Sequence, residues 1–413
     1  MGRRVVVSGL GMISPLGLTT EASWEGLVAG RSGAAPIRRF DPADLEVRFG
    51  CEVKDFDPSV YIDRKEAKRY DRFLQYAIAA ATMAMKDAGL GDTAPDAERT
   101  GVIIGSGIGG IGTFEEQCKI YLTAGPKRVS PFFVPMFIPD IASGIVSIRT
   151  GAKGPNYCTV SACASSAHAL GESFRLIQSG VADMMITGGA EAAITPLAIA
   201  GFTNMRALSM RNDAPEQASR PFDKGRDGFV MGDGAGIVVL ESLESAQTRG
   251  ARIYAELVGY GLSGDAHHIT QPAPNGEGAQ RAMRMALADS GVEPTAVGYV
   301  NTHGTSTPQG DVGEVQAVKA VFGQHAYRMI VGSTKSMTGH LLGAAGGLEF
   351  GISVLAMHHG VIPPTINQDD PDPECDLNCA PNVAVKRQVD VIMSNSFGFG
   401  GHNASLMARR WSN

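Results

Sequence analysis

The sequence predicts an α/β fold built from two similar halves, each a mainly parallel sheet covered by helices. Apolar segments typical of strands alternate along the chain with segments of helical periodicity, which is the pattern of α/β proteins. The 44% hydrophobic content and the 52 glycines fit a compact enzyme with many tight turns. At 413 residues the chain exceeds the size at which a single core stops growing, so two units are expected.

The individual elements follow from local patterns. A strand is expected at 4–12, directly after the N-terminus, and another at 297–300. Helical periodicity predicts four helices, at 73–88, 171–178, 278–290 and 346–357.

A weak internal repeat supports the division into two halves. The strand at 4–12 is echoed at 253–261, and 232–240 is echoed by 398–406, in the same order. These echoes predict an N-terminal half over 1–250 and a C-terminal half over 251–413. Insertions in the first half, at roughly 50–150 and 200–230, are expected to form a cap.

Composition and charge exclude several classes of function. The formal net charge of −6 disfavours nucleic acid as a partner. No apolar run approaches the roughly 20 residues needed to cross a bilayer, and the start lacks the apolar core of a signal peptide, so a soluble cytoplasmic protein is expected. The six cysteines are irregularly spaced, which favours reduced thiols. Cys375 and Cys379 form a single pair with no second pair to complete a zinc site, so no metal is expected.

Cys163 is the strongest candidate for a nucleophile. An apolar, strand-like segment breaks into small residues around it, and these open a long helical pattern that ends near Gly180. The first turn of a helix carries partial positive charge and unpaired N–H groups, which favour a thiolate and can hold an oxyanion. The alternative is an inert buried cysteine that packs as a small hydrophobe.

Two histidines and a lysine in the second half point to acyl transfer. His303 follows the apolar run 297–300, and Lys335 and His340 lie in a glycine-containing segment before a helical pattern. Such positions at strand ends or helix starts often carry chemistry. A thiolate nucleophile with neutral imidazoles that donate hydrogen bonds to an enolate or oxyanion fits this set.

Four motifs together resemble one family. The Cys163 segment, 302–308, 335–340 and 395–403 are similar to the beta-ketoacyl-acyl carrier protein synthases, and the resemblance covers nearly the whole chain. Ile108, within 105–110, makes it most like the type II elongating enzyme of dissociated fatty acid synthesis. The resemblance implies a thiolase-like fold, with two duplicated halves in a five-layered α/β/α/β/α sandwich, and a homodimer. The apolar segment 131–148 would line the dimer interface and the substrate tunnel, with plain core as the alternative.

The resemblance also implies a role for each matching residue. Cys163 would carry the acyl chain, and His303 and His340 would hold the thioester oxygen while a malonyl group loses carbon dioxide. Lys335, paired with Glu349, would organise the charges, carry a proton, or form a merely structural salt bridge. Phe399 would act as a gate whose backbone N–H joins that of Cys163 in the oxyanion hole.

Substrate and partner contacts are implied in the same way, with no cofactor besides the phosphopantetheine of the carrier. Thr305 and Thr307 would bind the pantetheine arm, and Phe202 and Ile108 would lie at the channel and the acyl pocket. An acidic acyl carrier protein needs a local basic patch. The matching positions are Lys65, Lys68, Arg69, Lys127, Arg128 and Arg206.

Four other readings remain open. A polyketide ketosynthase would use the same residues. A non-catalytic partner subunit would lack the cysteine, which is present here. A thiolase would use a second cysteine as the base where this chain has histidines. A cysteine hydrolase has no local signature in this sequence.

Overall fold

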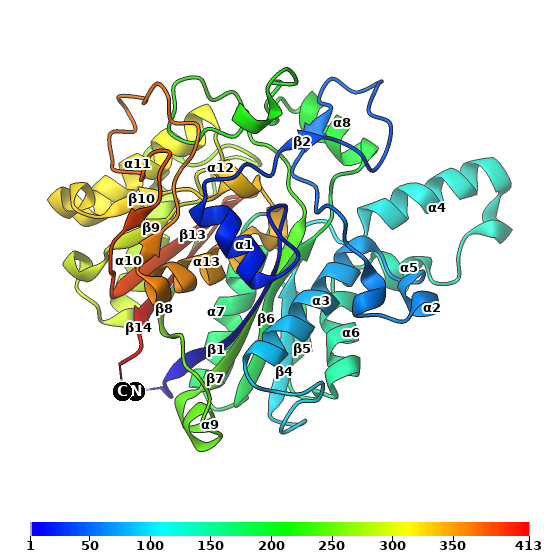
Figure 1. Ribbon diagram of the computed structural model, residues 1–413, viewed down its shortest axis with the longest axis horizontal. Helices are drawn as coiled ribbons and strands as arrows, with labels where there is room; N and C mark the ends of the chain where they lie inside the picture. The colour runs from blue at the N-terminus through cyan, green and yellow to red at the C-terminus, as the bar shows by residue number, and fades with distance from the viewer. Residues whose placement is uncertain (1, 413) are drawn as a thin grey trace.

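The computed structural model describes residues 2–412, and its core is one ten-stranded sheet (Figure 1). In spatial order the strands are β10 (Ile330–Gly332), β9 (Tyr299–Asn301), β13 (Val391–Gly398), β14 (His402–Arg410), β8 (Ala255–Gly264), β1 (Val5–Ile13), β7 (Gly234–Ser242), β6 (Met184–Glu191), β4 (Thr100–Gly105) and β5 (Asn156–Tyr157). The strands expected at 4–12 and 297–300 are β1 and β9, with ends shifted by one or two residues.

The sheet consists of two five-stranded parts with the same strand order, which meet where β1 pairs with β8. From that seam outwards, one part runs β1, β7, β6, β4, β5 and the other runs β8, β14, β13, β9, β10. In both parts the second strand is antiparallel to its neighbours, and the three outer strands are parallel. In each part four of the five strands run in the same direction and only the second strand is reversed, so the expectation of a mainly parallel sheet in each half is confirmed.

Helices cover both faces of each part and form five layers. Helix α3 (Arg72–Asp87) packs on one outer face, against β1 and β7, and α10 (Glu277–Ser290) packs on the other, against β8 and β14, with α11 (Pro308–Phe322) beside it. Between the two parts lie α7 (Ser165–Gln178) and α13 (Ala345–His359), which contact strands of both (Figure 1).

The sequence explains which helix takes the central position. Residues 345–357 of α13 are buried on every side, and a helix that is apolar all round belongs inside a protein. By contrast, α10 has one buried face, with Ala282, Met283 and Ala286 inward, and it ends at the left-handed Gly291. All four helices predicted from periodicity are present, although α7 begins six residues earlier than expected.

The cap is smaller than the insertions suggested. Helix α3 and strand β4 fall within 50–150 but belong to the core layers. Helix α6 (Ile141–Thr150) also belongs to them, because it lies beside α3 and packs against β4 and β5. The remaining helices outside the layers are α1 (Thr20–Val28), α2 (Arg64–Ala67), α4 (Ile111–Ala124), α5 (Phe133–Phe137), α8 (Pro196–Asn204), α9 (Leu243–Thr248) and α12 (Lys335–Thr338). Helix α4 projects from the body (Figure 1).

Two small two-stranded sheets complete the fold, β2 (Ala35–Pro36) with β3 (Phe49–Gly50) and β11 (Val361–Ile362) with β12 (Val385–Lys386). Within residues 2–412 every helix is too short or too polar to cross a membrane.

Candidate active site

Cys163 lies on a strained turn between β5 and α7. The preceding residue, Ala162, has a φ of 50°, a left-handed conformation that non-glycine residues rarely adopt. The Ser165 hydroxyl holds the turn, because it accepts from the Ser161 N–H at 2.9 Å and donates to the Ala162 carbonyl at 2.7 Å. The Cys163 side chain is only 7% exposed. The turn therefore presents the thiol in a fixed place just before the helix begins.

The loop after β13 lies directly against this turn. A β carbon at Gly398 would lie 2.6 Å from the Ser161 carbonyl oxygen and 3.0 Å from the Cys163 nitrogen, so only glycine fits there. This close approach brings the backbone N–H of Phe399 to the Cys163 sulfur, where it lowers the thiol pKa together with the N–H of Cys163 itself. Two backbone donors thus meet at one point, as an oxyanion hole requires.

His303 and His340 converge on the same thiol from the other half of the chain. His303 follows β9, and His340 follows α12. Their rings lie edge to face with centroids 5.3 Å apart. The Cys163 sulfur and one nitrogen of each ring all lie within 4.8 Å of one another. The structure therefore brings together three residues that are far apart in sequence.

Both imidazoles are neutral at physiological pH. Desolvation is the main cause of a pKa well below the usual value for His303 and His340, and the nearby Lys335 lowers both further. Nδ1 of His303 and both ring nitrogens of His340 are buried without a hydrogen-bond partner among residues 2–412. Neutral rings with free nitrogens can donate hydrogen bonds to a substrate oxygen.

Lys335 and Glu349 form a buried ion pair beneath the histidines. Nζ of Lys335 lies 2.5 Å from a carboxylate oxygen of Glu349, and both side chains are at most 2% exposed. Burial raises the pKa of Glu349 to about 7, and the lysine opposes this shift. The pair joins the start of α12 to α13, as the resemblance implied.

The expectation that Cys163 rests as a thiolate was wrong. Burial raises the pKa of this thiol to about 12, and it outweighs the lowering by Lys335 and by the N–H groups of Phe399 and Cys163. The resting form at neutral pH is therefore the thiol.

A carboxylate that the sequence reasoning missed supports the His303 loop. Glu314, buried on α11, accepts from the N–H groups of His303 and Gly304 at 2.9 and 2.8 Å, and from the Asn395 amide at 3.2 Å. Burial raises its pKa to about 7. Glu314 thus ties the His303 loop to strand β13. A lone acidic residue on a helix resembles a surface charge in sequence, so no signal identified it.

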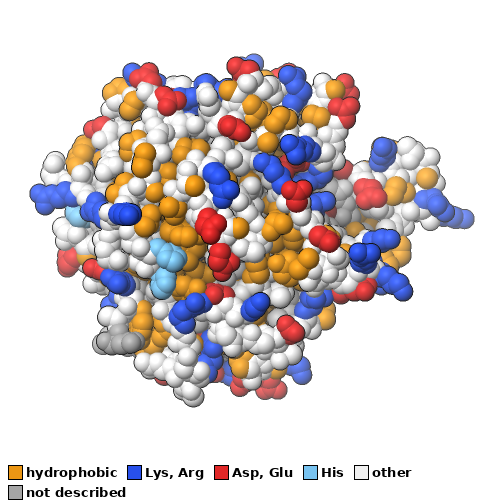
Figure 2. Space-filling view, in the orientation of Figure 1, with side chains coloured by type: hydrophobic (Ala, Val, Ile, Leu, Met, Phe, Trp, Pro, Cys, Tyr) orange, Lys and Arg blue, Asp and Glu red, His pale blue; other side chains and the backbone are white. Residues whose placement is uncertain are grey.

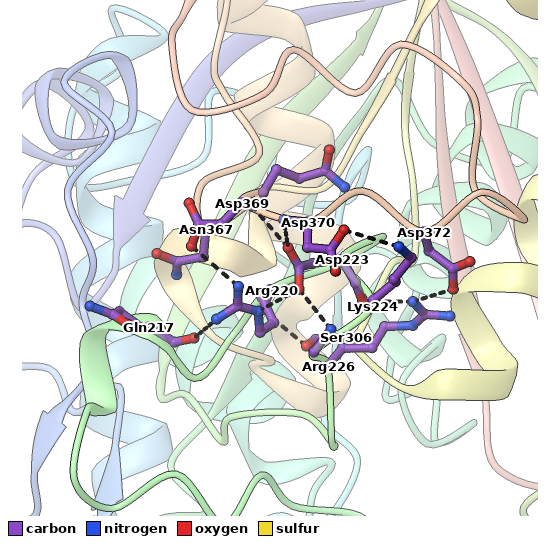
Figure 3. A network of polar contacts seen from close by, with 12 residues as sticks. Gln217, Arg220, Asp223, Lys224, Arg226, Ser306, Asn367, Asp369, Asp370 and Asp372 are labelled. Carbon is purple, nitrogen blue, oxygen red and sulfur yellow. Dashed lines mark hydrogen bonds and ion pairs between the residues drawn. The ribbon is translucent and has the colours of Figure 1, made fainter.

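A polar network fixes the loop that follows His303 (Figure 3). Ser306 has a φ of 69° and is held by bonds to Arg220, Gly228 and Asp311. Ion pairs connect these contacts to the segment 369–372; they are Arg220–Asp223, Arg220–Asp369, Lys224–Asp370, Arg226–Asp311 and Arg226–Asp372. The strained Ser306 between Thr305 and Thr307 is therefore a fixed point of the site, and sequence reasoning missed it too.

A cavity of about 390 Å³ leads to the three central residues. Its walls include Phe202, Thr305, Thr307, Phe399 and Arg206, together with Cys163, His303 and His340. The hydroxyls of Thr305 and Thr307 lie 3.1 Å apart. The volume is typical of a small-molecule site.

Ile108 does not line this cavity. Its half-buried side chain instead packs against an apolar cluster that includes Cys163, Phe202 and Leu342. Ile108 therefore belongs to the apolar surroundings of the cavity and not to its lining.

The basic residues expected to dock a carrier are all exposed, but they lie at different places. Arg206 lies on the cavity wall, with a φ of 57°. Lys65, Lys68 and Arg69 lie in and just after α2, and Lys127 and Arg128 lie in the short 3-10 helix that follows α4. Figure 2 shows Lys and Arg side chains gathered on the side of the molecule where α2 and α4 lie. The Arg69 guanidinium packs over the Phe132 ring at 4.9 Å.

Cys163, His303 and His340 are also the group within residues 2–412 whose donor atoms are close enough to hold a metal ion. Lys335 opposes a cation there, because its charge already acts on both rings. The six cysteines are free thiols.

Comparison with known proteins identifies the family. The beta-ketoacyl synthase N-terminal domain family matches residues 2–246, and the beta-ketoacyl synthase C-terminal domain family matches 254–369. The chain is 56% identical over 409 residues to a 3-oxoacyl-acyl-carrier-protein synthase 2 of Synechocystis, which covers 99% of this chain and 98% of the relative. It is equally similar, over 99% of both chains, to the protein of the same name from Staphylococcus aureus strain COL.

Solved structures share the whole fold. The ishigamide ketosynthase/chain length factor has a TM-score of 0.93 at 39% identity, with complete coverage of both chains. A beta-ketoacyl synthase from Burkholderia phymatum has a TM-score of 0.92 at 36% identity, covering 99% of this chain and all of that one. The structure of a type II PKS acyl-carrier protein in complex with its ketosynthase has a TM-score of 0.91 at 34% identity, with full coverage of both chains. The fold is thiolase-like, and the chain belongs to the beta-ketoacyl synthase family.

Proposed function

We propose that this protein condenses an acyl chain, held on Cys163, with a malonyl-acyl carrier protein to give a beta-ketoacyl-acyl carrier protein in fatty acid elongation. The observation that carries this proposal is the convergence of the Cys163 sulfur and two neutral imidazoles within 4.8 Å at the end of one cavity. The 56% identity to proteins named 3-oxoacyl-acyl-carrier-protein synthase 2 supports the substrate class.

The first half-reaction loads the enzyme. The Cys163 sulfur attacks the carbonyl carbon of an acyl thioester, the carbon–sulfur bond to the carrier breaks, and the carrier leaves as a free thiol. The N–H groups of Cys163 and Phe399 stabilise the oxyanion of the intermediate. Because the resting group is a thiol, its proton must leave as the new bond forms and ends on the departing carrier thiol.

The second half-reaction forms the carbon–carbon bond. The malonyl carboxylate leaves as carbon dioxide, and the electron pair of the broken bond forms an enolate whose oxygen accepts hydrogen bonds from His303 and His340. The enolate carbon then attacks the acyl carbonyl, and the Cys163 sulfur leaves and regains a proton. Since one partner leaves before the next reacts, the kinetics are ping-pong. No step requires a cofactor beyond the phosphopantetheine of the carrier.

Lys335 acts in this scheme as an electrostatic organiser. Burial is the main cause of the low pKa of both histidines, and the Lys335 charge lowers the pKa of each further and so helps to keep them in the neutral, donating form. A direct proton transfer by Lys335 is the second choice, and the buried pair with Glu349 as a merely structural link is the third. Phe399 acts as the gate, because Gly400 and Gly401 beside it have φ of 85° and 74° and permit a backbone swing.

The substrate arm and its carrier approach from the cavity side. Thr305 and Thr307 bind the pantetheine arm, and Phe202 borders its channel, since all three line the cavity. Arg206 at the cavity and the basic residues Lys65, Lys68, Arg69, Lys127 and Arg128 dock the acidic acyl carrier protein. We place Ile108 at the acyl pocket, because it packs on the apolar cluster that contains Cys163.

The protein acts as a homodimer in this proposal. Large apolar side chains are exposed on α4, α5, α6 and β5 and just before α5; they are Tyr121, Leu122, Phe132, Val134, Ile148 and Tyr157. Strand β5 ends the large sheet, and its outer edge is free to pair with the same edge of a second copy. The segment 131–148 then belongs to the interface. We also propose a division of the chain near residue 250, which the repeated strand order supports. A cytoplasmic location is proposed as well.

Mass spectrometry of the intact protein tests the function. Incubation with an acyl-acyl carrier protein should add the acyl mass to Cys163, and later addition of malonyl carrier should remove it with formation of a beta-ketoacyl product. Cys163→Ala is the control that should carry no adduct. Release of free acid without condensation would shift the assignment to a hydrolase.

A polyketide ketosynthase is the second candidate, because one similar solved structure is named as a type II PKS complex and another as a ketosynthase/chain length factor. Their identities of 39% and 34% are lower than the 56% above. Repeated condensation without reduction of the beta-keto group, measured as product mass, would favour it.

A further inference from the structure

A buried carboxylate that the proposed reaction does not use lies beside the nucleophile. Glu191, at the end of β6, is fully buried. It accepts four hydrogen bonds, from the Ser106 hydroxyl at 2.9 Å and from the backbone N–H groups of Gly107 at 2.6 Å, Ile108 at 3.2 Å and Gly343 at 3.0 Å. One carboxylate therefore joins two loops that come from different halves of the chain.

Two glycines allow the loops to meet around this carboxylate. A β carbon at Gly343 would lie 2.6 Å from a Glu191 oxygen, and one at Gly107 would lie 3.0 Å from the same oxygen and 3.5 Å from the Ala162 carbonyl. Any larger residue would push the loops apart. The close packing also places the carboxylate near the Cys163 turn, and its negative charge raises the pKa of the Cys163 thiol.

The residues next to these glycines belong to the apolar cluster that contains Cys163. Ile108, whose own N–H is bound by Glu191, packs on the apolar cluster that contains Cys163. Leu342, next to Gly343, lines the cavity and has a left-handed φ of 48°. Glu191 thus fixes the backbone at or beside two apolar residues of this cluster at once. A strained residue such as Leu342 persists only where its surroundings hold it.

We propose that Glu191 is a specificity-determining positioning residue, which holds Ile108 and Leu342 in place beside Cys163 and so sets the range of acyl lengths that the site accepts. This inference rests on the condensing function proposed above. The ligand it concerns is the saturated acyl chain on Cys163.

The test compares Glu191→Gln with the unchanged protein over saturated acyl carrier substrates of increasing length. A glutamine places N–H groups against the backbone donors, so the loops lose their common anchor. The ratio of kcat/KM between the best and the worst chain length should fall by about tenfold, because fitting of an apolar chain to its pocket carries discrimination of this size. A fall in kcat/KM that is equal for all lengths would overturn the proposal.

A second readout separates this role from a general loss of stability. Removal of the negative charge should move the pH profile of Cys163 alkylation to lower pH, since Glu191 raises the pKa of that thiol. Glu241→Gln is the matched control, because Glu241 is also fully buried and bonded to Ser8 and Arg249 but lies outside the site. It should leave the length profile and the alkylation profile unchanged.

Ser106→Ala provides the test if Glu191→Gln does not fold. It removes one of the four donors and keeps the carboxylate, so a smaller change in the length profile, in the same direction, is expected. An unchanged length profile in folded Glu191→Gln, or in folded Ser106→Ala where Glu191→Gln does not fold, would overturn the inference. Failure of the unchanged protein to make any beta-ketoacyl product would instead overturn the proposed function, and the alkylation profiles would still report whether Glu191 acts on Cys163.

Discussion

The rings of His303 and His340 lie edge to face with their centroids 5.3 Å apart, and they reach this position from two different loops of the C-terminal half. Both are neutral, and both have buried ring nitrogens that find no hydrogen-bond partner among residues 2–412. Such a pair can stabilise an enolate oxygen, but the attack of Cys163 on a thioester does not require it.

Replacing either histidine by alanine should therefore separate the two half-reactions. His303→Ala and His340→Ala should lower the rate of malonyl decarboxylation by about 100-fold, a typical cost of losing one oxyanion donor, and change acyl loading far less. Carbon dioxide release and adduct formation on Cys163 measure the two steps. His267→Ala, at an exposed histidine, is the control. Equal losses in both steps would contradict this division of roles.

Alkylation of Cys163 should depend steeply on pH. With a thiol pKa of about 12, the rate with iodoacetamide should keep rising by about tenfold per pH unit above neutral pH, without a plateau near pH 7 to 8. The site of modification is read by peptide mass spectrometry, with Cys163→Ala as the control. A plateau near neutral pH would restore the resting thiolate that the helix terminus suggested.

Removing only one partner of the buried ion pair between Lys335 and Glu349 should destabilise the protein. Glu349→Gln leaves the lysine charge uncompensated at 1% exposure, so the free energy of unfolding should fall by about 3–5 kcal/mol in urea titrations. The double variant Lys335→Met with Glu349→Leu should recover much of this stability. If it also recovered condensation, Lys335 would be a structural residue and not an organiser of the histidines.

Charge reversal at the docking residues should weaken the reaction with carrier-bound substrates only. Lys65→Glu with Arg206→Glu should raise KM for carrier-bound acyl groups by about tenfold and leave reactivity with small thioesters unchanged. Lys386→Glu, at an exposed position on β12, is the matched control. Equal loss on both kinds of substrate would count against the docking surface.

The exposed apolar surface of α4 and α5 should hold the dimer. Leu122 is 81% exposed and Val134 is 58% exposed, so Leu122→Glu with Val134→Glu should shift the sedimentation coefficient to that of a single chain. Val383→Glu changes a similarly exposed valine outside this surface and should not alter it. A monomeric unchanged protein would remove the basis of this prediction.

Local patterns in the sequence identified much of this molecule. Helices α3, α10 and α13 follow from periodicity, and the motifs around Cys163, His303 and His340 identify the residues that converge. The reversed direction of β7 and β14 did not follow, because these strands read like any buried strand and their antiparallel pairing depends on the path of the whole chain.

The electrostatic properties of the site also could not be predicted from the sequence. Nothing local to Cys163 reveals the burial that keeps it protonated. Likewise, Glu191 and Glu314 are ordinary acidic residues in sequence, and only the folded chain surrounds them with backbone N–H groups. Desolvation and long-range hydrogen bonds are properties of the assembled core.

The repeated strand order has a consequence for how this site can change. The Cys163 turn follows β5 and the segment of Lys335 and His340 follows β10, and these two strands hold the same place in the two halves. Ile108 and His303 follow β4 and β9, which also correspond. In the proposed reaction, one half thus supplies the nucleophile and the other supplies the two histidines that assist decarboxylation. A substitution at Ile108 in the first half can therefore change the apolar surroundings of Cys163 and leave the histidines of the second half intact.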